Sequence, residues 1–373
     1  MIRLAVTGAG VLCSAGIGPE AVAAALRGDG APTGGNALDG LYDEPLPGNR
    51  GHALVDFDVV AHLGRKGTSG LDRSSSLAVV ACGMALADGE VEIDDRTRRR
   101  IGVALGTTAG SLRSMSDYTR QTLVEERPYL VNPMRFPTTV MNCPAGQAAI
   151  RHGLQGVNTT IAGGRLAFAH LVRHAGRVLG DAQAGALVAG AVEEFTPHRA
   201  WAAHLGNGAE VAAGEGAAVF VLKRADATED AASRVQAEIL SACVGYSPAG
   251  ARSNGDDGVE RCARRALAQA GVGPADVGLV TIDGAPDGTC ADGERAAVDA
   301  VLEHTDADVV AIAPLFGACE AASGALQLAV VLARQRDGSA PDGEVALMVS
   351  STREGGAAAV VAKGRSGDGA DRL

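Results

Sequence analysis

His170 and His174 stand four residues apart in a stretch predicted to be helical, a spacing that places both imidazoles on one face and can hold a metal ion. No acidic or cysteine side chain close in the sequence supplies a third ligand. We therefore expect both histidines to be packed or solvent-facing, and we expect no metal. His152, within the run Arg151-His152-Gly153, is expected to be a capping or core histidine.

The seven cysteines show no paired spacing typical of a metal site, and they lie in apolar or alanine-rich surroundings. We expect them to be reduced and mostly buried in a cytosolic protein. Cys290 and Cys319 remain candidates for a thiol nucleophile, although neither stands at the start of a predicted helix with a base nearby. The run Gly8-Ala9-Gly10 lacks the third glycine and the later acid of a dinucleotide-binding loop, and no cofactor is expected.

Composition limits the functions that the chain can have. Of the 373 residues, 46% are hydrophobic and 21% are charged, which suits a globular protein with an ample core. A net charge of −11 with scattered basic residues argues against nucleic-acid binding. No apolar run approaches transmembrane length, and the N-terminus is typical of a strand and turn rather than a signal peptide. We therefore expect a cytoplasmic location.

Short β-rich runs alternate with alanine-rich helical runs, which predicts an α/β fold with mostly buried sheets. We predict strands at Ile101–Thr107 and Asn158–Ala162, and a helix at Arg165–Leu179. Pro128–Pro137 is expected to be an extended loop, and Val309–Leu315 another strand. These elements must place any functional side chains at strand ends and helix starts.

The same order of strands and helices is expected twice, which suggests an internal duplication. We predict an N-terminal half over residues 1–232 and a C-terminal half over residues 233–363. Small and polar residues at 225–233 indicate the link between the halves. Residues 364–373 are expected to form a disordered tail.

Several motifs, in order and spacing, resemble those of β-ketoacyl synthases over nearly the whole chain. Residues 156–165 (GVNTTIAGGR) are similar to the segment that this family writes Gly-Pro-Asn-x-x-Val-x-Thr-Ala-Cys, in which the cysteine opens a helix. The other matching segments are AVTGAGVLCSAG at residues 5–16, residues 136–156, LVAGAVE at 187–193, GEGAAVFVL at 214–222, GPADVGLVTID at 273–283 and GACEAASG at 317–324. The resemblance implies the thiolase fold, in which two pseudo-duplicated halves stack as five α-β-α-β-α layers.

The chain departs from this family at the residues that carry its chemistry. Arg165 stands at the position of the nucleophilic cysteine, and a guanidinium has no usable lone pair with which to attack a thioester. Asp283 and Ala318 stand where the family has its two histidines. An acid at position 283 would repel an enolate, and alanine cannot transfer a proton. Ala313-Pro314 replaces the supporting lysine, and Glu320 matches a family glutamate.

These losses make the chain similar to a chain length factor, the non-catalytic subunit of a type II polyketide ketosynthase pair. That resemblance implies a heterodimer with a catalytic ketosynthase, which receives the growing chain from an acyl carrier protein. It also implies a tunnel whose length is set by Ser111, Ser114, Met115 and Tyr118, with Tyr118 closing it. An ordinary amphipathic helix with Met115 and Tyr118 in the core is the alternative. Asn158, Thr159, Thr160, Ile161 and Ala162 would form the dimer interface.

Two other functions stay open on sequence grounds. One is an enzyme with altered acyl-transfer chemistry that uses Asp283, Cys319 or a histidine in the old pocket. The other is a stand-alone homodimeric scaffold or binding protein. Chain length factors usually carry glutamine where this chain has Arg165, and a buried ion pair between Arg165 and Asp283 would explain both charges. Contacts of these charges with solvent or with a partner chain are the alternatives.

Overall fold

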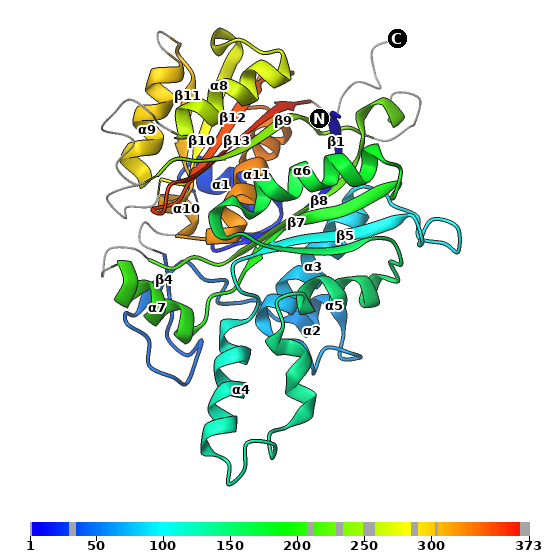
Figure 1. Cartoon of the computed structure of the whole chain (residues 1–373), viewed down its shortest axis with the longest axis vertical. Helices are drawn as coiled ribbons and strands as arrows, with labels where there is room; N and C mark the ends of the chain where they lie inside the picture. The colour runs from blue at the N-terminus through cyan, green and yellow to red at the C-terminus, as the bar shows by residue number, and fades with distance from the viewer. Residues whose placement is uncertain are drawn as a thin grey trace.

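Figure 1 shows a layered α/β molecule with an arm extending from one end. The structure, a computed structural model, describes residues 2–29, 35–207, 212–228, 234–248, 258–284, 290–302 and 305–365. Most of its strands form one hydrogen-bonded series in the order β11-β10-β12-β13-β9-β1-β8-β7-β5-β6, with β2 beside β1, and β3 and β4 form a separate two-stranded sheet. The predicted halves meet where Leu4–Val6 of β1 pair antiparallel with Ala237–Ile239 of β9.

The elements of the first half run from Leu4 to Ala227. Its elements, with 3-10 helices written η, are β1 (Leu4–Cys13), β2 (Gly16–Ile17), α1 (Pro19–Leu26), β3 (Asn36–Ala37), β4 (Arg50–Gly51), α2 (Val59–Leu63), α3 (Arg73–Asp88), β5 (Ile101–Thr107), α4 (Leu112–Val124), η1 (Pro133–Thr139), α5 (Cys143–His152), β6 (Asn158–Ala162), η2 (Gly164–Leu166), α6 (Ala167–Gly180), β7 (Ala186–Glu193), α7 (Pro197–Asn207), β8 (Gly216–Arg224) and η3 (Ala225–Ala227).

The second half repeats the strand order of the first. Its elements are β9 (Ala237–Tyr246), α8 (Gly258–Ala270), η5 (Pro274–Asp276), β10 (Val277–Ile282), α9 (Cys290–Val301), β11 (Asp308–Ala311), α10 (Ala313–Phe316), η6 (Glu320–Ala322), α11 (Ser323–Arg336), β12 (Val345–Ser351) and β13 (Gly356–Gly364). The order β1-β8-β7-β5-β6 corresponds strand by strand to β9-β13-β12-β10-β11. This repeat is the thiolase-like architecture that the resemblance implies, and it confirms the predicted fold class.

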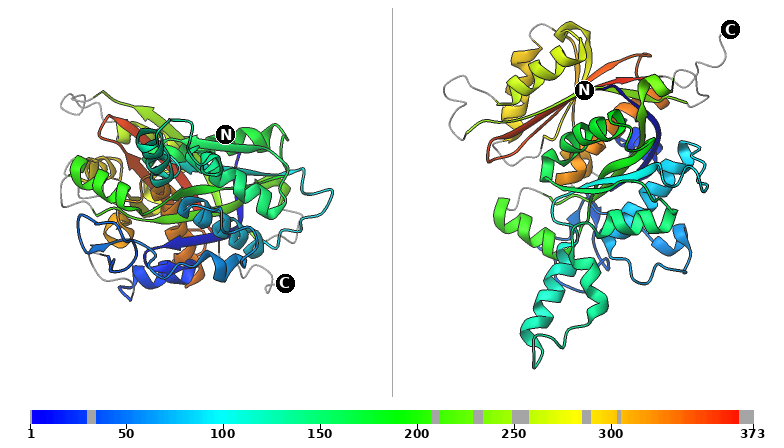
Figure 2. Two further views of the ribbon diagram at one scale, coloured as in Figure 1. Left: turned by 90° about the horizontal axis from the view of Figure 1, so that it is seen from below. Right: turned by 45° about the vertical axis from the view of Figure 1, so that its right-hand side comes forward.

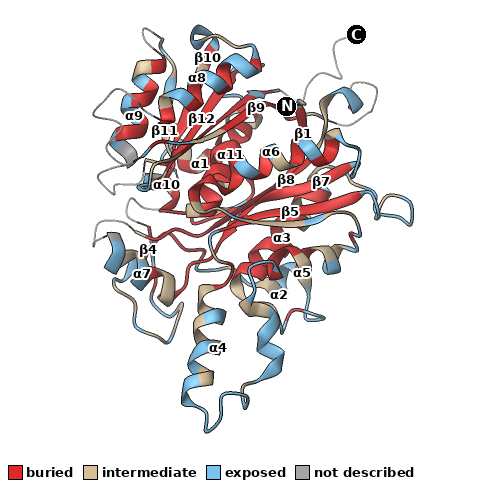
Figure 3. Ribbon diagram, in the orientation of Figure 1, coloured by how far each residue is buried: buried red, intermediate tan, exposed pale blue. Residues whose placement is uncertain are grey.

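Three large hydrophobic cores lie between the layers that Figure 1 shows. The middle core holds α6 and α11 between the two groups of strands, and Phe168 of α6 packs edge-on against Phe220 of β8 with 6.0 Å between the ring centroids. Gly324 of α11 faces Phe168 so closely that an added Cβ would lie 2.9 Å from the Cβ of Phe168. The outer cores pack α3 and α5 on one sheet face, and α8 and α9 on the other. The sheets and middle helices are accordingly buried in Figure 3.

The arm consists of α4 and the segment through η1, and it projects from the body in Figure 1 and in the right-hand view of Figure 2. None of the residues of α4 or η1 is buried. Tyr118 of α4 packs edge-on against Phe136 of η1, with ring centroids 6.0 Å apart. Large apolar side chains on this arm are exposed, among them Leu123 and Met134 at 80% and 81%. An apolar surface of this kind is typical of an interaction site.

Three sequence predictions are wrong in detail. Residues 133–139 form the 3-10 helix η1 rather than continuing an extended loop, because Asn132 caps the turn and Pro133 suits its first position. The strand predicted at Val309–Leu315 ends at Ala311 and gives way to the short helix α10, where Pro314 again suits a first turn. Gly364 belongs to β13, not to the tail. Residues 366–373 and the predicted boundary at 232/233 lie outside the described residues.

Candidate functional site

Arg165 lies at the junction between β6 and α6. The strand ends at Ala162, and a two-glycine turn, with Gly164 at φ +50°, leads into η2, which precedes α6 directly. The guanidinium is only 6% exposed, and its Nε lies 3.3 Å from Asp283 Oδ2 and 3.5 Å from Glu320 Oε2. The ion pair between Arg165 and Asp283 that the sequence suggested is therefore confirmed.

Asp283 follows β10 directly and is fully buried. Glu294 of α9 fixes this turn, because its Oε2 accepts hydrogen bonds from the backbone N–H groups of Asp283 at 3.0 Å and Gly284 at 3.3 Å. The hydroxyl of Ser351 donates to Oε1 of Glu294 at 2.9 Å. Burial, and then the nearby charge of Asp283, raise the pKa of Glu294 to about 8. Arg165 therefore faces several acidic groups that would repel one another without it.

Ala318 lies in the turn between α10 and η6, and its side chain is buried. Its carbonyl oxygen accepts a hydrogen bond from Arg199 Nη2 at 3.1 Å. The preceding Gly317 has φ +77°, and an added Cβ would lie 2.7 Å from the Cβ of His52, so only glycine fits. Glu320 has φ +42°, an uncommon conformation for a residue with a side chain, and this places its carboxylate toward Arg165.

The cavity that Arg165 lines is almost closed. Its volume is about 10 Å³, so it holds at most one water molecule. Phe168, Gln327, Met348 and Ser350 are among its lining residues, and none of the described residues that line it is a cysteine or histidine. In this arrangement the side chains can hold a buried ion pair, and they offer an incoming thioester neither a nucleophile nor an imidazole.

The glycine loop after β12 packs beside this site. Thr352 and Gly356 close it with a backbone hydrogen bond of 2.9 Å. Gly355 has φ +99°, and an added Cβ would lie 1.8 Å from the carbonyl oxygen of Ser247. A Cβ on Gly356 would lie 2.7 Å from Leu166 Cδ1. Backbone geometry and packing therefore require glycine at position 355, and Gly356 packs closely against Leu166.

The remaining chemical candidates from the sequence are structural. His152 contacts the carbonyl oxygen of Val79 through Nε2 at 2.9 Å, as expected of a core histidine. His174 contacts the Thr159 hydroxyl at 3.1 Å, and the described residues contain no cluster of three or more His, Cys, Asp or Glu arranged to hold a metal. Cys319 is fully buried, and burial raises the pKa of its thiol well above the usual value. The side chain of Cys290 lies outside the described residues.

The cysteines that the structure describes are free thiols and are buried: Cys13, Cys82, Cys143, Cys243, Cys262 and Cys319. Burial raises the pKa of several of these thiols, that of Cys82 to about 12, so they are poor thiolates at neutral pH. This agrees with the expectation of reduced core cysteines. Over the described part of the chain, each helix is too short or too polar to span a bilayer.

The residues predicted to set tunnel length lie at the base of the arm. Ser111 caps α4 and is buried, and its hydroxyl donates to Glu194 Oε1 at 3.1 Å. Ser111 and Ser114 line a pocket of about 520 Å³. Met115 is 39% exposed and Tyr118 packs on Phe136, so neither lies in the core of this chain as the alternative reading expected.

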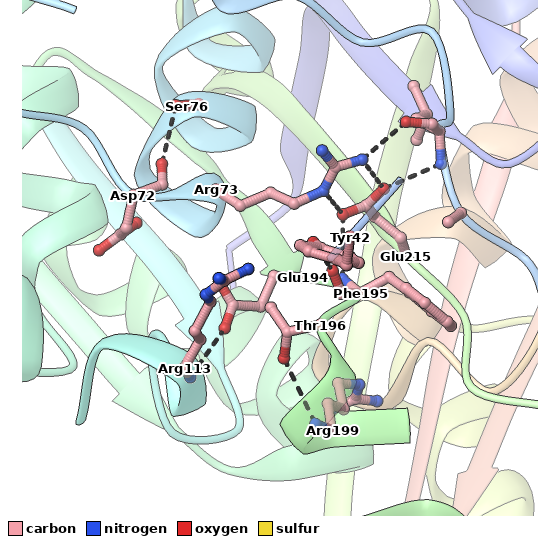
Figure 4. Close-up of polar contacts among 12 residues, drawn as sticks. Tyr42, Asp72, Arg73, Ser76, Arg113, Glu194, Phe195, Thr196, Arg199 and Glu215 are labelled. Atoms are coloured by element: carbon pink, nitrogen blue, oxygen red, sulfur yellow. Dashed lines mark hydrogen bonds and ion pairs between the residues drawn. The ribbon is translucent and has the colours of Figure 1, made fainter. Parts of the chain in front are cut away.

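Sequence reasoning missed the buried charges behind this pocket, which Figure 4 shows. Arg73 at the start of α3 forms a two-pronged ion pair with Glu215, through Nε at 2.5 Å and Nη2 at 2.7 Å. Glu193, at the end of β7, is buried and pairs with Arg199 at 2.9 Å. The signal in the sequence was the doublet of Glu193 and Glu194 directly after a buried apolar strand.

The predicted interface strand β6 stands at the end of the strand series and pairs only with β5 among the described residues. Its residues Asn158 and Ala162 are exposed, and the three between them are partly exposed. An edge strand with free backbone groups is suited to pairing with another chain. The structure thus leaves the predicted interface residues accessible.

Comparison with known proteins identifies the family. Residues 1–212 match the family description "Beta-ketoacyl synthase, N-terminal domain", and residues 236–343 match "Beta-ketoacyl synthase, C-terminal domain". The chain belongs to the β-ketoacyl synthase family. The 3-oxoacyl-[acyl-carrier-protein] synthase 2 of Vibrio harveyi is 32% identical over 38% of this chain, which corresponds to 34% of that protein. The synthase 2 of Staphylococcus aureus (strain MRSA252) is 25% identical over 76% of this chain and 73% of its own.

Two solved structures are similar over almost the whole chain. A structure described as the ishigamide ketosynthase/chain length factor has a TM-score of 0.84 and 32% identity, over 97% of this chain and 99% of that one. AntDE:AntF, a type II polyketide ketosynthase with its acyl carrier protein, has a TM-score of 0.78 over 98% of this chain and 100% of that one. At 15% identity, the second likeness supports the fold alone. The alignments with two curated relatives, from Vibrio harveyi and Vibrio cholerae, span only 34% and 46% of those proteins.

Proposed function

We propose that this chain is a chain length factor, a ketosynthase-like subunit without condensing activity of its own. It pairs with a catalytic ketosynthase and shapes the tunnel that limits the length of a polyketide or fatty-acyl chain. The observation that carries the proposal is the buried ion pair of Arg165 with Asp283, at the position that the motif resemblance assigns to the family's cysteine. Removing this cation to open a pocket would leave an acid buried alone, so the ion pair is part of the folded scaffold.

Three further observations support the proposal. The cavity beside Arg165 is too small for an acyl chain. Cys319 is fully buried, with a thiol whose pKa is raised, and is a poor substitute nucleophile. The likeness to the ishigamide ketosynthase/chain length factor extends over the whole length of both chains. Together they favour the accessory subunit over an enzyme of altered chemistry.

The surface of the chain is suited to such a pair. The edge strand β6 offers backbone hydrogen-bonding groups, and the arm of α4 and η1 carries exposed apolar side chains. In the proposed heterodimer these surfaces face the catalytic subunit, and an acyl carrier protein delivers the growing chain to the cysteine of that subunit. Arg165 blocks the unused pocket and stabilises the complex.

Co-expression with the ketosynthase encoded beside this chain tests the proposal. We expect the purified pair to condense acyl units, and we expect mutation of the partner's cysteine to abolish that activity. This chain alone should form no covalent adduct with an acyl thioester, as mass spectrometry would detect. An adduct on this chain, or activity that survives loss of the partner's cysteine, would replace the proposal with an enzyme of altered chemistry.

Substitutions at two of the tunnel positions should change the length of the product in opposite directions. Tyr118→Ala should shift products of the pair to longer chains, and Ser114→Phe to shorter ones. Each methylene accommodated in or excluded from a pocket is worth about 1–3 kcal/mol, so the ratio of long to short product should change about tenfold or more. Tyr118→Phe is the matched control, because it keeps the ring contact with Phe136. Mass spectrometry of the products measures the ratio, and equal shifts in one direction from both variants would contradict the tunnel.

A further inference from the structure

The pocket at the base of the arm, which the tunnel positions Ser111 and Ser114 also line, contains acidic groups that the proposed function does not use. It lies between the start of α3, the start of α4 and the residues that follow β7, and it shares no lining residue with the cavity beside Arg165. Its volume of about 520 Å³ is in the range of small-molecule sites. Tyr42, Asp72, Arg113 and Glu194 are among the residues that line it (Figure 4).

Glu194 is the deepest acidic group of this pocket and is only 1% exposed. Its Oε1 accepts hydrogen bonds from the Ser111 hydroxyl at 3.1 Å and from the backbone N–H of Arg113 at 3.4 Å. Its Oε2 is buried and has no hydrogen-bond partner among the residues that the structure describes. A buried carboxyl oxygen without a hydrogen-bond partner is costly, which favours a ligand that pairs with it there.

Asp72 contributes a second acceptor to the same pocket. Its Oδ1 caps α3 by accepting the backbone N–H of Ser75 at 2.6 Å. Its Oδ2 is buried and, over the described ranges, likewise lacks a hydrogen-bond donor. Burial raises the pKa of Asp72, and the charge of Asp72 in turn raises that of Glu194. The charge of Asp72 therefore acts on Glu194, and a cation bound beside the two groups would favour the ionised form of both.

The cations nearby are already engaged or lie at the surface. Arg73 is bound to Glu215 by two hydrogen bonds and to the carbonyl oxygen of Leu54 by a third. Arg113 pairs with Glu44 and lies over the ring of Tyr42, 5.1 Å from its centroid. A weaker contact of 3.8 Å joins Arg113 to Asp117, and Arg135 is an exposed side chain that also lines the pocket. None of these contacts supplies a donor to Glu194 Oε2 or Asp72 Oδ2.

We propose that this pocket binds a small protonated alkylamine, whose N–H groups donate to Glu194 Oε2 and Asp72 Oδ2. An ammonium group offers both the positive charge and the donors that these two oxygens lack. A metal ion fits less well, because the described residues include no cluster of three or more acidic, histidine or cysteine side chains arranged to hold one. The inference goes beyond the proposed function and does not depend on it.

The affinity for the amine should depend on pH, and the protonation of Glu194 determines the direction of that dependence. Burial, followed by the charge of Asp72, raises the pKa of Glu194 to about 8, so a free pocket holds this group mostly protonated at neutral pH. The ammonium of an alkylamine requires the carboxylate. Affinity should therefore rise as pH rises toward 8, by up to about tenfold per pH unit, as the proton leaves Glu194.

Ligand-observed saturation-transfer NMR on the full-length chain, with n-butylamine as the probe and n-butanol as the neutral control, tests the proposal. We expect transfer to butylammonium that is stronger at pH 8 than at pH 6.5, and none to butanol. Glu194→Gln and Asp72→Asn should each weaken binding about tenfold or more, since each keeps the shape and removes the charge. Asparagine also caps helices well, so Asp72→Asn should fold normally.

Asp117→Asn is the matched control, because it removes an acidic side chain of the same pocket that is partly exposed and already paired. It should leave affinity unchanged within about twofold. Equal signals from butylamine and butanol would overturn the proposal, as would binding that survives both Glu194→Gln and Asp72→Asn. Since neither residue belongs to the Arg165 site, this result is independent of pairing with a ketosynthase.

Discussion

Replacement of Arg165 by methionine should lower the free energy of unfolding by about 3–5 kcal/mol, because Asp283 would stay buried without its cation. The side chains are 6% and 1% exposed, so solvent cannot replace the lost partner. Glu294 adds to the effect, since its carboxyl group senses both Asp283 and Arg165. Urea unfolding followed by circular dichroism, at constant pH, measures the change.

Two variants control for simple loss of packing. Arg264→Met removes an exposed i,i+4 ion pair with Glu260 on α8 and should cost less than about 1 kcal/mol. The double replacement Arg165→Met/Asp283→Leu, which removes both buried charges, should recover much of the stability lost in Arg165→Met alone. A loss in Arg165→Met no larger than in Arg264→Met would show that the buried ion pair does not hold the site.

The stability that Glu294 and Glu194 contribute should fall as pH rises from about 5 to 8. Glu294 and Glu194 each have a pKa raised from 4.5 to about 8, chiefly by burial. Between these two values the folded protein binds more protons than the unfolded chain, so added base favours unfolding. Each group contributes at most about 1.4 kcal/mol per pH unit in that window. Over the three pH units from 5 to 8, the upper limit for the two groups together is about 8 kcal/mol.

Glu294→Gln isolates one of these contributions. The amide keeps an oxygen to accept from the backbone N–H groups of Asp283 and Gly284, and it can donate to Ser351. We expect this variant to have a flatter dependence of unfolding free energy on pH, measured by urea titration at pH 5, 6, 7, 8 and about 9. Identical profiles for the variant and the native chain would contradict the raised pKa of Glu294.

Much of the fold could be predicted, because a buried strand appears in the sequence as an uninterrupted run of apolar residues. The strands Ile101–Thr107 and Val345–Ser351 have the bounds that their apolar runs indicate. The repeated order of elements also predicts the duplicated strand series. The helix α7 was missed, because its start at Pro197 follows a polar turn without a strong apolar period.

The sequence predicts residues of the candidate site only where a residue differs from the one that the β-ketoacyl synthase motif has at that position. Arg165 and Asp283 are visible in this way, and their opposite charges suggest the ion pair that the structure contains. Glu294 could not be found, because an acid on a helix is normally solvated and the sequence does not report burial. For Glu194, the sequence offers only the acidic doublet that it forms with Glu193 at the end of a buried strand. Their roles follow from which layers cover them, which is a property of tertiary packing.

The mass of the complex that this chain forms tests the central claim most directly. This chain would be tagged and co-expressed with the untagged ketosynthase encoded beside it, and the eluted species would be weighed by native mass spectrometry. The account predicts a stable one-to-one heterodimer in which the partner alone carries the reactive cysteine. A homodimer of this chain, formed equally well with and without the ketosynthase, would contradict it.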